Sequence, residues 1–400
     1  MKKVIQFGAG KIGRGFLGEL FYRSGYETVF VDVDRELISK INHHKAYRIK
    51  ILKAGFFDED SVEDSGGLIE VKNIAGIDAG DVDLVTDALA GVQLAATAVG
   101  ARALKPVSSL IALGIEKRAA LKVKAPLDII ICENLPHPAA TLKNYIFENL
   151  KDEIRPYAEK YLGLVESVVS RMVPDITEKE GPGMLIEAEE YSRLPVAKNG
   201  FKGPVPEITG MIPHDNLEAL VERKLFMHNA GHALCSYWGY QKGYRHVFEA
   251  VRDGVVRKRL LASMEESAIA LCRKHGFTEV ENREYGEDLV RRFDNEGLKD
   301  TVERGARDPV RKLGHDERLV GAANLAISYG IVPSNLALGI AAAIRYDDRR
   351  DKSAVEILKK VDRGGVDLVL KDVCLLDPDG ELACLIRKSY QELNKLLKIK

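Results

Sequence analysis

The chain has 400 residues, more than one hydrophobic core usually serves, so we expect two domains, each with a substantial interior. Its 59 basic residues nearly balance 60 acidic ones, and no basic stripe with interleaved aromatic residues indicates a nucleic-acid surface. No apolar run reaches the length of about 18 residues that a membrane span needs. Five scattered cysteines, with no CxxC pair and no secretory leader, favour a reducing compartment. We therefore expect a cytoplasmic protein that binds a small-molecule substrate and neither nucleic acid nor membrane.

The first part of the chain alternates between predicted strands and helices. "KKVIQF" is typical of a buried strand, "IGRGFLGELFYRSG" has helical spacing, and "TVFVDVD" is a second strand. This order implies parallel pairing with a right-handed crossover. The alternation continues in "GLIEVKNI", "DVDLVTDALA", "VQLAATAVG", "RALKPVSSLIALGIEKR" and "LDIIICENL". We predict an α/β fold that begins with a Rossmann-type, doubly wound parallel sheet.

The second part of the chain is predicted to be mostly α-helical. Strand signals largely vanish beyond Asn216, where amphipathic segments such as "NLEALVERKLFMHNAGHALCSYWGY" and "VVRKRLLASMEESAIALCRKHG" begin. We expect a dinucleotide-binding domain over residues 1–195 and a helical substrate domain over residues 196–400. Because two domains can form their own cleft, we expect a monomer, and a dimer is also compatible with the sequence.

The turn after the first predicted strand, "FGAGKIGRG", carries Gly8, Gly10 and Gly13 in GxGxxG spacing. Such glycines permit a tight turn and a close approach to a pyrophosphate, while the helix N-terminus offers N–H groups to the anion. A glycine turn without a ligand is the alternative. Asp32, at the end of the next strand, favours a cofactor, because its carboxylate suits a ribose diol. The same carboxylate repels a 2′-phosphate, which favours NAD over NADP, although Arg35 would suit such a phosphate if Asp32 turned aside.

A second glycine-containing turn, "TAVG", ends another predicted strand at the edge of the sheet where ligands bind. A plain strand-to-helix turn explains it equally well. The predicted NAD-binding residues are Phe7, Gly8, Ala9, Gly10, Lys11, Ile12, Gly13, Asp32, Thr97, Ala98, Val99 and Gly100.

The segment "KLFMHNAGH" (224–232) carries the residue types of a metal-free hydride-transfer site. Lys224, Asn229 and His232 supply a base and polar groups that bind an alkoxide. On an α-helix, His228 lies about 40° around the axis from Lys224, His232 about 80° and Asn229 about 140°. These side chains would share one broad arc that could line a cleft. The polar side of a core helix is the alternative.

Other chemistries have less support in the sequence. His228 and His232 are four residues apart and could hold zinc, but neither an HExxH motif nor a third ligand accompanies them, so we expect no metal site. A GxSxG elbow of a serine hydrolase is also missing. Asn134, directly after a predicted strand in "IICENLPH", adds a second amide that could act with Asn229 on an alkoxide. A strand-end turn before Pro136 explains Asn134 equally well.

Together, "FGAGKIGRGF", "TAVG", "CENLPH", "SRMVP", "FKG" and "DNLEALVERKLFMHNAGHA" resemble the polyol-specific long-chain dehydrogenases. The resemblance runs in order along almost the whole chain. It implies an NAD-dependent, metal-independent interconversion of D-mannitol 1-phosphate and D-fructose 6-phosphate. It also implies that Lys224 is the general acid/base, that Asn134 and Asn229 stabilise the alkoxide, and that His232 orients the substrate.

A phosphorylated substrate needs cationic groups, and "DPVRKLGHDERLV" offers Arg311, Lys312 and Arg318. A charged surface loop explains these residues equally well. Two other functions stay open: a dehydrogenase of an unphosphorylated hexitol or sugar acid, and a non-catalytic NAD-sensing Rossmann protein. A sensor would have no need of Lys224, Asn134 and Asn229 together. The sequence leaves the role of His228 undecided between a supporting and a packing residue.

Overall fold

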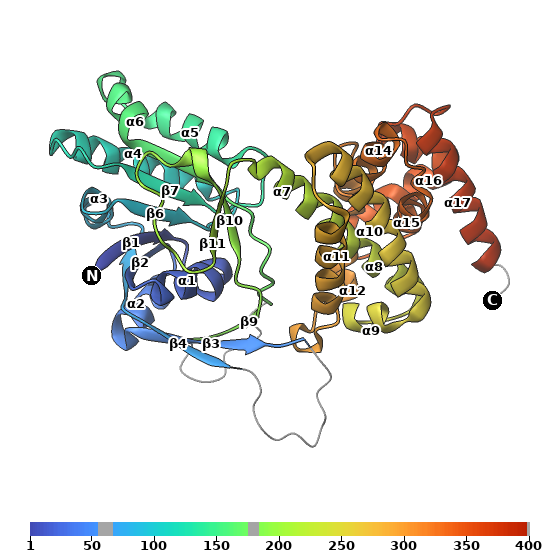
Figure 1. Cartoon of the computed structure of the whole chain (residues 1–400), viewed down its shortest axis with the longest axis horizontal. Coiled ribbons are helices and arrows are strands. Elements are labelled where there is room, and N and C mark those ends of the chain that lie inside the picture. The colour runs from blue at the N-terminus through green and yellow to red at the C-terminus, as the bar shows by residue number, and fades with distance from the viewer. Residues whose placement is uncertain (55–66, 175–183, 398–400) are drawn as a thin grey trace, which may run out of the picture. The chain divides into compact units, whose positions relative to one another are not determined.

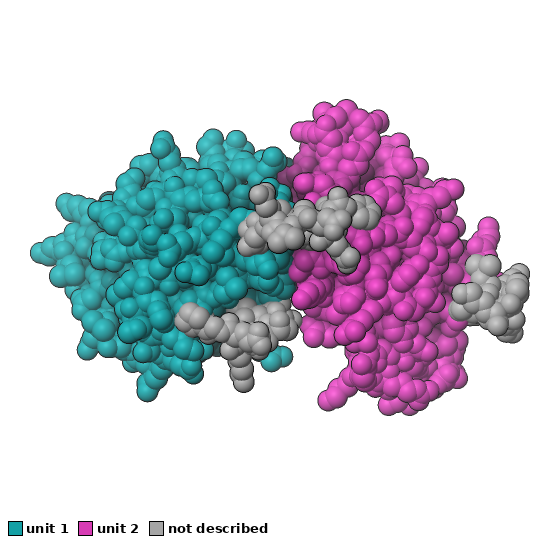
Figure 2. All heavy atoms as spheres, turned by 90° about the horizontal axis from the view of Figure 1, so that it is seen from below, with its two compact units in different colours: residues 1–53, 59–217 teal, residues 54–58, 218–400 magenta. Residues whose placement is uncertain are grey.

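The computed structural model describes residues 1–54, 67–174 and 184–397. The chain divides into two compact units, one made of residues 1–53 and 59–217 and the other of 54–58 and 218–400 (Figure 2). This division lies beyond residue 195, where the sequence suggested the boundary. The reason is that strand β10 (Leu194–Ala197) pairs in parallel with β11 (Met211–His214), which keeps the segment up to residue 217 with unit 1.

Unit 1 contains a six-stranded parallel sheet in the order β5-β2-β1-β6-β7-β8 (Figure 1). Its strands are β1 (Lys2–Phe7), β2 (Tyr26–Asp32), β5 (Ile74–Asp78), β6 (Leu94–Thr97), β7 (Leu127–Ile131) and β8 (Leu162–Glu166). Its helices are η1 (Gly13–Leu17), α1 (Gly18–Arg23), α2 (Arg35–His44), α3 (Val82–Ala90), α4 (Leu104–Ala120), α5 (Pro138–Asn149), η2 (Asp152–Ile154) and α6 (Arg155–Tyr161).

Side-chain alternation along the strands gives the sheet two buried faces. Ile5 and Val29 face a core shared with α3, α4, α5 and α6, whereas Val4 and Phe16 belong to a core on the side of α1. Helices therefore cover both faces, and the predicted doubly wound Rossmann-type sheet is confirmed.

A small three-stranded sheet in the order β4-β3-β9 adjoins this layer. It contains β3 (Ala46–Leu52), β4 (Leu68–Lys72) and β9 (Leu185–Glu189), and the helix η3 (Lys198–Gly200) follows β10. The single strand predicted over "GLIEVKNI" is wrong in one respect. Asn73 takes a positive φ of 56°, so the segment divides into β4 in the small sheet and β5 at the edge of the large one.

Unit 2 is helical, as predicted. No strand follows β11 in the part of the chain that the structure describes. The helices are α7 (Leu217–Arg223), η4 (Lys224–Asn229), α8 (Ala230–Lys242), α9 (Val247–Arg252), α10 (Gly254–His275), α11 (Glu279–Phe293), η5 (Glu296–Leu298), α12 (Val302–Ala306), α13 (Pro309–Lys312), α14 (Val320–Ser328), α15 (Ser334–Ile344), α16 (Lys352–Asp372) and α17 (Glu381–Leu397).

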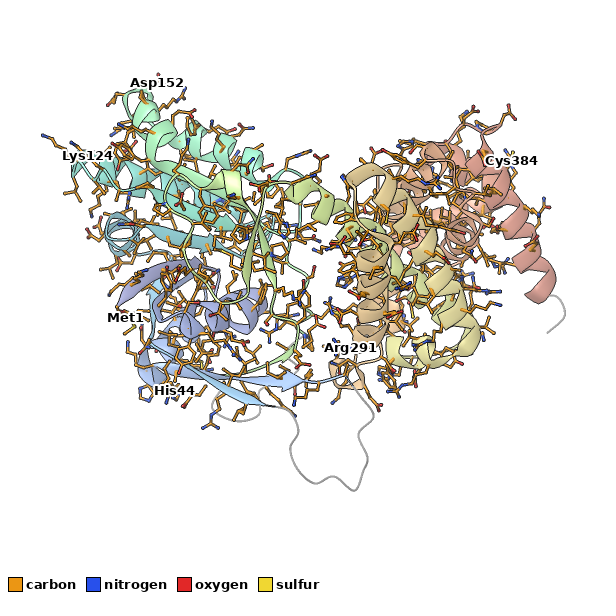
Figure 3. All side chains as sticks on the ribbon, viewed as in Figure 1. Met1, His44, Lys124, Asp152, Arg291 and Cys384 are labelled. Atoms are coloured by element: carbon orange, nitrogen blue, oxygen red, sulfur yellow. The ribbon has the colours of Figure 1, made fainter. Side chains whose placement is uncertain are left out.

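Helix α8 is the centre of unit 2. It packs against α9, α10, α12 and α15, and its Tyr237 and Trp238 side chains are fully buried. The five cysteines are free, and Cys384 is exposed on α17 (Figure 3). No described helix combines the length and the apolar character of a membrane-spanning segment. Candidate residues on or next to α8 therefore rest on a rigid, well-packed element.

Candidate active site

The glycine loop between β1 and η1 has the geometry that its sequence predicts. Gly8 has a φ of 90°, and a Cβ there would lie 2.5 Å from the backbone oxygen of Ala98. A Cβ on Gly13 would lie 1.9 Å from the Gly8 oxygen, so both positions require glycine. A Cβ on Gly10 would meet no atom within 4 Å. The loop is therefore tight underneath and open above Gly10, as a pyrophosphate site requires.

Asp32 ends β2 and lies against this loop. Its Oδ2 accepts a hydrogen bond from the Ala9 N–H at 2.6 Å, and its Oδ1 accepts one from the Asp34 N–H at 3.0 Å. Arg35 instead pairs with Asp78, with 2.6 Å between Nε and Oδ2. The arginine that would suit a 2′-phosphate is thus directed to another carboxylate, and Asp32 is fixed beside the loop.

The cation beneath the loop is Arg14, which the sequence analysis missed. Its side chain is buried, its Nε donates to the Ala9 oxygen at 2.6 Å, and its Nη1 has no hydrogen-bond partner among the described residues. Burial lowers its pKa, and Tyr47 and Asp32 oppose that shift. An arginine remains charged even so. Arg14 therefore adds positive potential below the place where a dinucleotide pyrophosphate would lie. Lys11 and Ile12, in the same turn, are half-buried.

The "TAVG" turn lies beside the glycine loop because β6 pairs with β1, and the Ala98 N–H donates to the Phe7 oxygen at 2.9 Å. Glu133 holds this turn in place. Its carboxylate accepts from the Thr97 hydroxyl at 2.6 Å and from the Val99 N–H at 2.9 Å. Burial raises the pKa of Glu133, and these hydrogen bonds oppose the rise. The sequence analysis missed Glu133, although an acidic residue directly after an apolar strand was a usable signal.

Asn134 follows Glu133 and is exposed. Strand β7, which precedes it, is the neighbour of β6 in the sheet. Asn134 therefore lies at the same carboxyl edge as the "TAVG" turn and the glycine loop, the edge at which ligands of such sheets bind. The structure thus brings the predicted cofactor residues and Asn134 together within unit 1.

The segment Lys224–Asn229 is a π-helical turn, which corrects the α-helical arrangement expected from the sequence. The Ala230 N–H donates to the Leu225 oxygen, a spacing of five residues instead of four. Five-residue spacing widens the turn and brings Asn229 towards the direction of Lys224. The angles of about 40°, 80° and 140° expected for an α-helix therefore do not apply to this segment. Such turns within α-helices are frequent at functional sites.

The turn separates a buried side from a half-buried one. Phe226, Met227 and His228 are buried, whereas Lys224 and Asn229 are half-buried. His228 packs on the Phe293 ring with 5.8 Å between ring centroids. Its burial, reinforced by Arg292 and Lys224, holds its pKa well below the ordinary value. His228 is therefore a buried imidazole that packs on Phe293 and whose burial favours the neutral form.

His232, one helical turn further on, contacts a carboxylate that the sequence analysis missed. Its Nε2 lies 2.7 Å from Oδ2 of Asp300, and Oδ1 of Asp300 accepts from Nε of Arg304 at 2.8 Å. Burial raises the pKa of Asp300, but His232 and Arg304 outweigh it and hold the pKa well below its usual range. Asp300 is 68 positions away in the chain, so no local spacing pointed to it. Among the described residues, no group of three His, Cys, Asp or Glu side chains could hold a metal.

The three residues predicted to bind a phosphate have different hydrogen-bond partners. Arg311 is exposed and pairs with Asp308 at 2.7 Å, while Arg318 is half-buried and contacts Glu317 at 3.2 Å. Lys312 instead points inward and donates to the Gly305 oxygen. Burial lowers the pKa of Lys312 to about 7, and Arg318 and Arg311 contribute to that shift.

Gly305 connects Lys312 to His232. A Cβ on Gly305 would lie 1.9 Å from the Ser236 hydroxyl and 3.0 Å from Cε1 of His232. The Gly305 backbone therefore lies directly against α8. Lys312 donates a hydrogen bond to the oxygen of the same residue.

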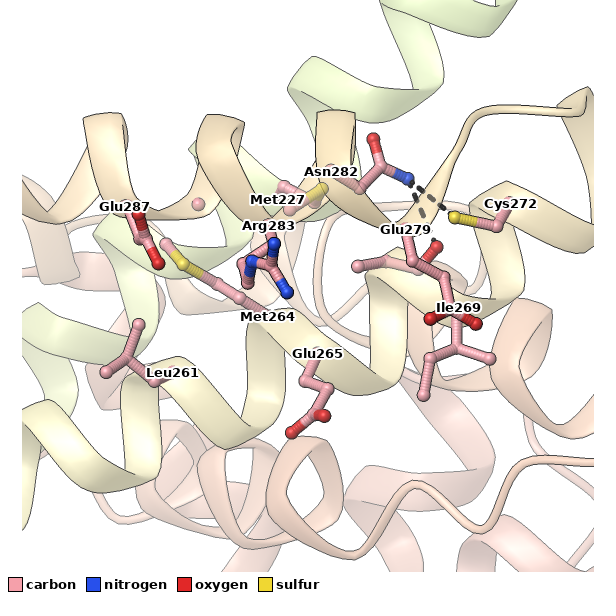
Figure 4. Close-up of a pocket in the computed structure, with 12 residues that line it drawn as sticks. Met227, Leu261, Met264, Glu265, Ile269, Cys272, Glu279, Asn282, Arg283 and Glu287 are labelled. Atoms are coloured by element: carbon pink, nitrogen blue, oxygen red, sulfur yellow. Dashed lines mark hydrogen bonds between the residues drawn. The ribbon is translucent and has the colours of Figure 1, made fainter.

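A cavity of about 340 Å³ lies between α10 and α11, next to the π-helical turn (Figure 4). Met227 and Met264 line it, together with the charged side chains of Glu265 and Arg283. The Asn282 amide donates to the Ala268 oxygen at 3.2 Å and to Sγ of Cys272 at 3.3 Å. None of the candidate catalytic residues lines this cavity.

A doubly wound sheet with a glycine loop, followed by a helical unit with a polar π-helical turn, defines a Rossmann-type dehydrogenase. Family comparisons identify the particular group. The mannitol dehydrogenase Rossmann domain matches residues 2–210, and the mannitol dehydrogenase C-terminal domain matches residues 216–369. The chain belongs to the mannitol dehydrogenase family, so the resemblance seen in the sequence is confirmed.

Full-length relatives have the same extent. A protein of Thermoanaerobacter pseudethanolicus named mannitol-1-phosphate 5-dehydrogenase is 35% identical over 395 residues, which cover 99% of each chain. A protein of Geobacillus stearothermophilus with the same name is 34% identical over 391 residues, or 97% of this chain and 99% of the relative. The chain is thus similar to these dehydrogenases from end to end.

Solved structures share the fold at lower identity. Mannitol 2-dehydrogenase of Pseudomonas fluorescens, in a ternary complex with NAD and D-mannitol, has a TM-score of 0.74 at 16% identity, covering 98% of this chain and 92% of that one. A D-sorbitol dehydrogenase in substrate-free form has a TM-score of 0.79 at 16% identity, covering 99% and 93%. A Rossmann domain followed by a helical domain is therefore the architecture of the family.

Proposed function

We propose that the chain interconverts D-mannitol 1-phosphate and D-fructose 6-phosphate by hydride transfer, with NAD as its cofactor and without a metal ion. The observation that carries this proposal is the end-to-end similarity to relatives named mannitol-1-phosphate 5-dehydrogenase. The π-helical turn supports it, because Lys224 and Asn229 are one five-residue turn apart on a rigid helix.

NAD as the cofactor is supported by the edge of the sheet in unit 1. The Asp32 carboxylate suits the hydroxyls of an adenosine ribose, and the open space at Gly10 suits a pyrophosphate. Arg35 pairs with Asp78 and is therefore directed away from a 2′-phosphate at Asp32. Arg14 supplies a buried positive charge below the loop. This combination favours NAD over NADP.

The proposal gives each candidate catalytic residue a role of its own. Bound NAD supplies the hydride acceptor. Lys224 takes the proton of the reacting hydroxyl in the oxidation and returns it in the reduction. The amides of Asn134 and Asn229 donate hydrogen bonds to the oxygen as its negative charge develops, and His232 holds a substrate hydroxyl. A metal ion is not required, because these groups supply both the base and the stabilisation of the alkoxide.

The substrate phosphate is assigned to Arg311, Lys312 and Arg318. Arg311 and Arg318 support this assignment best, since both lie at Glu317, where their guanidinium groups are held close to one another. Lys312 supports it less, because its amino group donates to the Gly305 oxygen. It would contact a phosphate only after giving up that hydrogen bond.

A test of the proposed function compares NADH oxidation with fructose 6-phosphate and with free fructose at neutral pH. Two charge-assisted hydrogen bonds to the phosphate are worth about 3 kcal/mol, so we expect kcat/KM to be roughly 100-fold higher for the phosphorylated ketose. Equal efficiency would favour the alternative, a dehydrogenase of an unphosphorylated hexitol or sugar acid.

The same assay with Lys224→Ala tests whether the protein is a catalyst at all. Loss of turnover with unchanged NAD binding supports catalysis by Lys224. A wild-type protein that binds NAD tightly but turns over neither these ketoses nor a wider set of phosphorylated and free ones would be an NAD-sensing protein instead.

A further inference from the structure

A carboxylate buried in unit 2 connects the candidate histidine with an arginine. The Asp300 side chain is 9% exposed and the His232 side chain 20% exposed, with 2.7 Å between Nε2 and Oδ2. The other carboxylate oxygen of Asp300 accepts from Arg304 Nε at 2.8 Å. Each oxygen of Asp300 thus has its own partner. The Asp300 side chain connects Arg304 of α12 with His232 of α8.

The backbone around Asp300 is fixed independently of its side chain. The Asp300 carbonyl accepts from the Val247 N–H at 2.9 Å, and the Val302 N–H donates to the Arg245 oxygen at 2.9 Å. Next to it, the Thr301 hydroxyl accepts from the Arg304 N–H at 3.2 Å and caps α12. These bonds hold Asp300 at one distance from α8. Replacing its side chain therefore leaves the anchoring of the loop intact.

A carboxylate can only accept hydrogen bonds, so the proton of a neutral His232 ring must be on Nε2, and Nδ1 is then an acceptor. We propose that Asp300, supported by Arg304, is a positioning residue that holds His232 in the Nε2–H tautomer and so makes Nδ1 the acceptor for a hydroxyl of the substrate. The part of this inference that concerns the substrate rests on the proposed function. The tautomer itself follows from the contact between Asp300 and His232.

Arg304 completes the arrangement by donating a hydrogen bond to the second oxygen of Asp300, which favours the ionised carboxylate. The Phe293 ring packs on His232 with 5.6 Å between centroids and limits rotation of the imidazole. Gly305 lies against Cε1 of His232 on the side of α12. The ring is thus held both by a hydrogen bond and by packing.

The direct test is the tautomer of His232 in the full-length protein labelled with ¹⁵N in its histidines. A long-range ¹H–¹⁵N spectrum distinguishes Nε2–H from Nδ1–H, and the His232→Gln variant identifies the signals. We expect Nε2–H in the wild type. We expect Asp300→Asn, which has nearly the same volume and can also donate, to shift part of His232 to the Nδ1–H form.

The matched kinetic test measures both substrates of the reduction. Loss of a group that orients a functional histidine typically costs about 10- to 100-fold in activity, so we expect Asp300→Asn to lower kcat/KM for fructose 6-phosphate by that factor and to leave the Kd of NADH unchanged. The control is Asp294→Asn, which removes a carboxylate paired with Arg252 at 2.5 Å and no histidine. We expect the control to alter neither the tautomer nor the rate.

An Nδ1–H tautomer in the wild type would overturn the inference, and that measurement needs no variant that might fail to fold. An unchanged tautomer in a folded Asp300→Asn protein would overturn it as well. If the wild type reduces no ketose phosphate, the proposed function fails. The spectrum still decides whether Asp300 fixes the ring.

Discussion

The candidate residues of unit 1 and those of unit 2 differ in whether the backbone or the side chains define the site. In unit 1, the cofactor loop depends on the backbone: Gly8 and Gly13 are required because a Cβ would strike a carbonyl oxygen. In unit 2, the candidate site depends on side chains, which a π-helical turn and the distant Asp300 place. The cofactor loop requires residues without a Cβ, whereas the candidate site in unit 2 requires particular side chains.

Both units place a π-helical turn next to the functional segment. In unit 1 the Gly18 N–H donates to the Gly13 oxygen, and in unit 2 the Ala230 N–H donates to the Leu225 oxygen. The five-residue spacing serves different ends. After the glycine loop it continues a helix whose residues are all buried, whereas in unit 2 it turns Asn229 towards Lys224. We therefore expect the glycine loop to be impaired by substitutions that add a side chain, and the candidate site in unit 2 by substitutions that remove a functional group.

Lys224→Ala should have the largest effect on activity. A general acid/base contributes typically 10²- to 10⁴-fold, so we expect kcat to fall by about that factor. Lys224 is half-buried, so the melting temperature and the Kd of NAD should change little. Stopped-flow kinetics measures kcat, and calorimetry measures the melting temperature and the Kd of NAD.

The control for Lys224 is Lys258→Ala, an exposed lysine on α10, which should keep full activity. Retained turnover in Lys224→Ala would show that the chemistry of unit 2 depends on another group. The candidate site in unit 2 would then not depend on the side chain of Lys224.

The same difference explains how much could be predicted from the sequence. The glycine spacing, Asp32 and the strand-helix alternation report backbone geometry directly, so the fold and the cofactor loop were predicted closely. The π-helical turn at Lys224–Asn229 was not, because such a turn leaves no known pattern in "KLFMHN". Asp300 and Glu133 were missed because each acts through a contact far along the chain, 68 and 36 positions from its partner.

Alanine substitutions of Gly13 and Gly10 distinguish space that the fold of the loop requires from space that the cofactor requires. Gly13→Ala should destabilise unit 1 by about 3 kcal/mol, because its Cβ would lie 1.9 Å from a backbone oxygen that cannot turn away. Gly10→Ala should fold like the wild type, since its Cβ meets no atom within 4 Å.

We expect Gly10→Ala to weaken NAD binding by roughly tenfold, about 1.4 kcal/mol, because the methyl group would occupy space needed by the pyrophosphate. Urea denaturation and isothermal titration calorimetry measure the two effects. Equal stability of the two variants would contradict the backbone account of the loop. Unaltered NAD binding in Gly10→Ala would place the cofactor elsewhere.

Lys312→Met should stabilise the protein by about 2–4 kcal/mol at pH 7, since it replaces a buried amino group with an apolar side chain of similar length. The pKa of Lys312 is lowered from 10.5 to about 7 in the folded chain. Between these values the unfolded chain binds more protons, so the stability of the wild type should rise as the pH rises from 7 towards 10.

Lys312→Met should lose that rise, and urea denaturation at several pH values measures it. If the variant is more stable but has a higher KM for fructose 6-phosphate, Lys312 contributes to substrate binding and lowers the stability of the protein. A variant that is less stable at every pH would mean that the hydrogen bond to Gly305 outweighs the burial of the amino group.

Arg311→Ala should have the smallest effect. The guanidinium is exposed and already paired with Asp308, and exposed ion pairs contribute about 0–1 kcal/mol, so the KM for fructose 6-phosphate should rise by no more than about fivefold. The KM for NADH should not change, because the cofactor residues belong to unit 1. Arg318→Ala should raise the KM for the ketose more, since Arg318 is less exposed than Arg311. Exposed Arg349→Ala is the control that should change neither KM. A parallel rise in both KM values for Arg311→Ala would contradict the assignment of Arg311 to the substrate phosphate, because a residue that binds only that phosphate should not affect the binding of NADH.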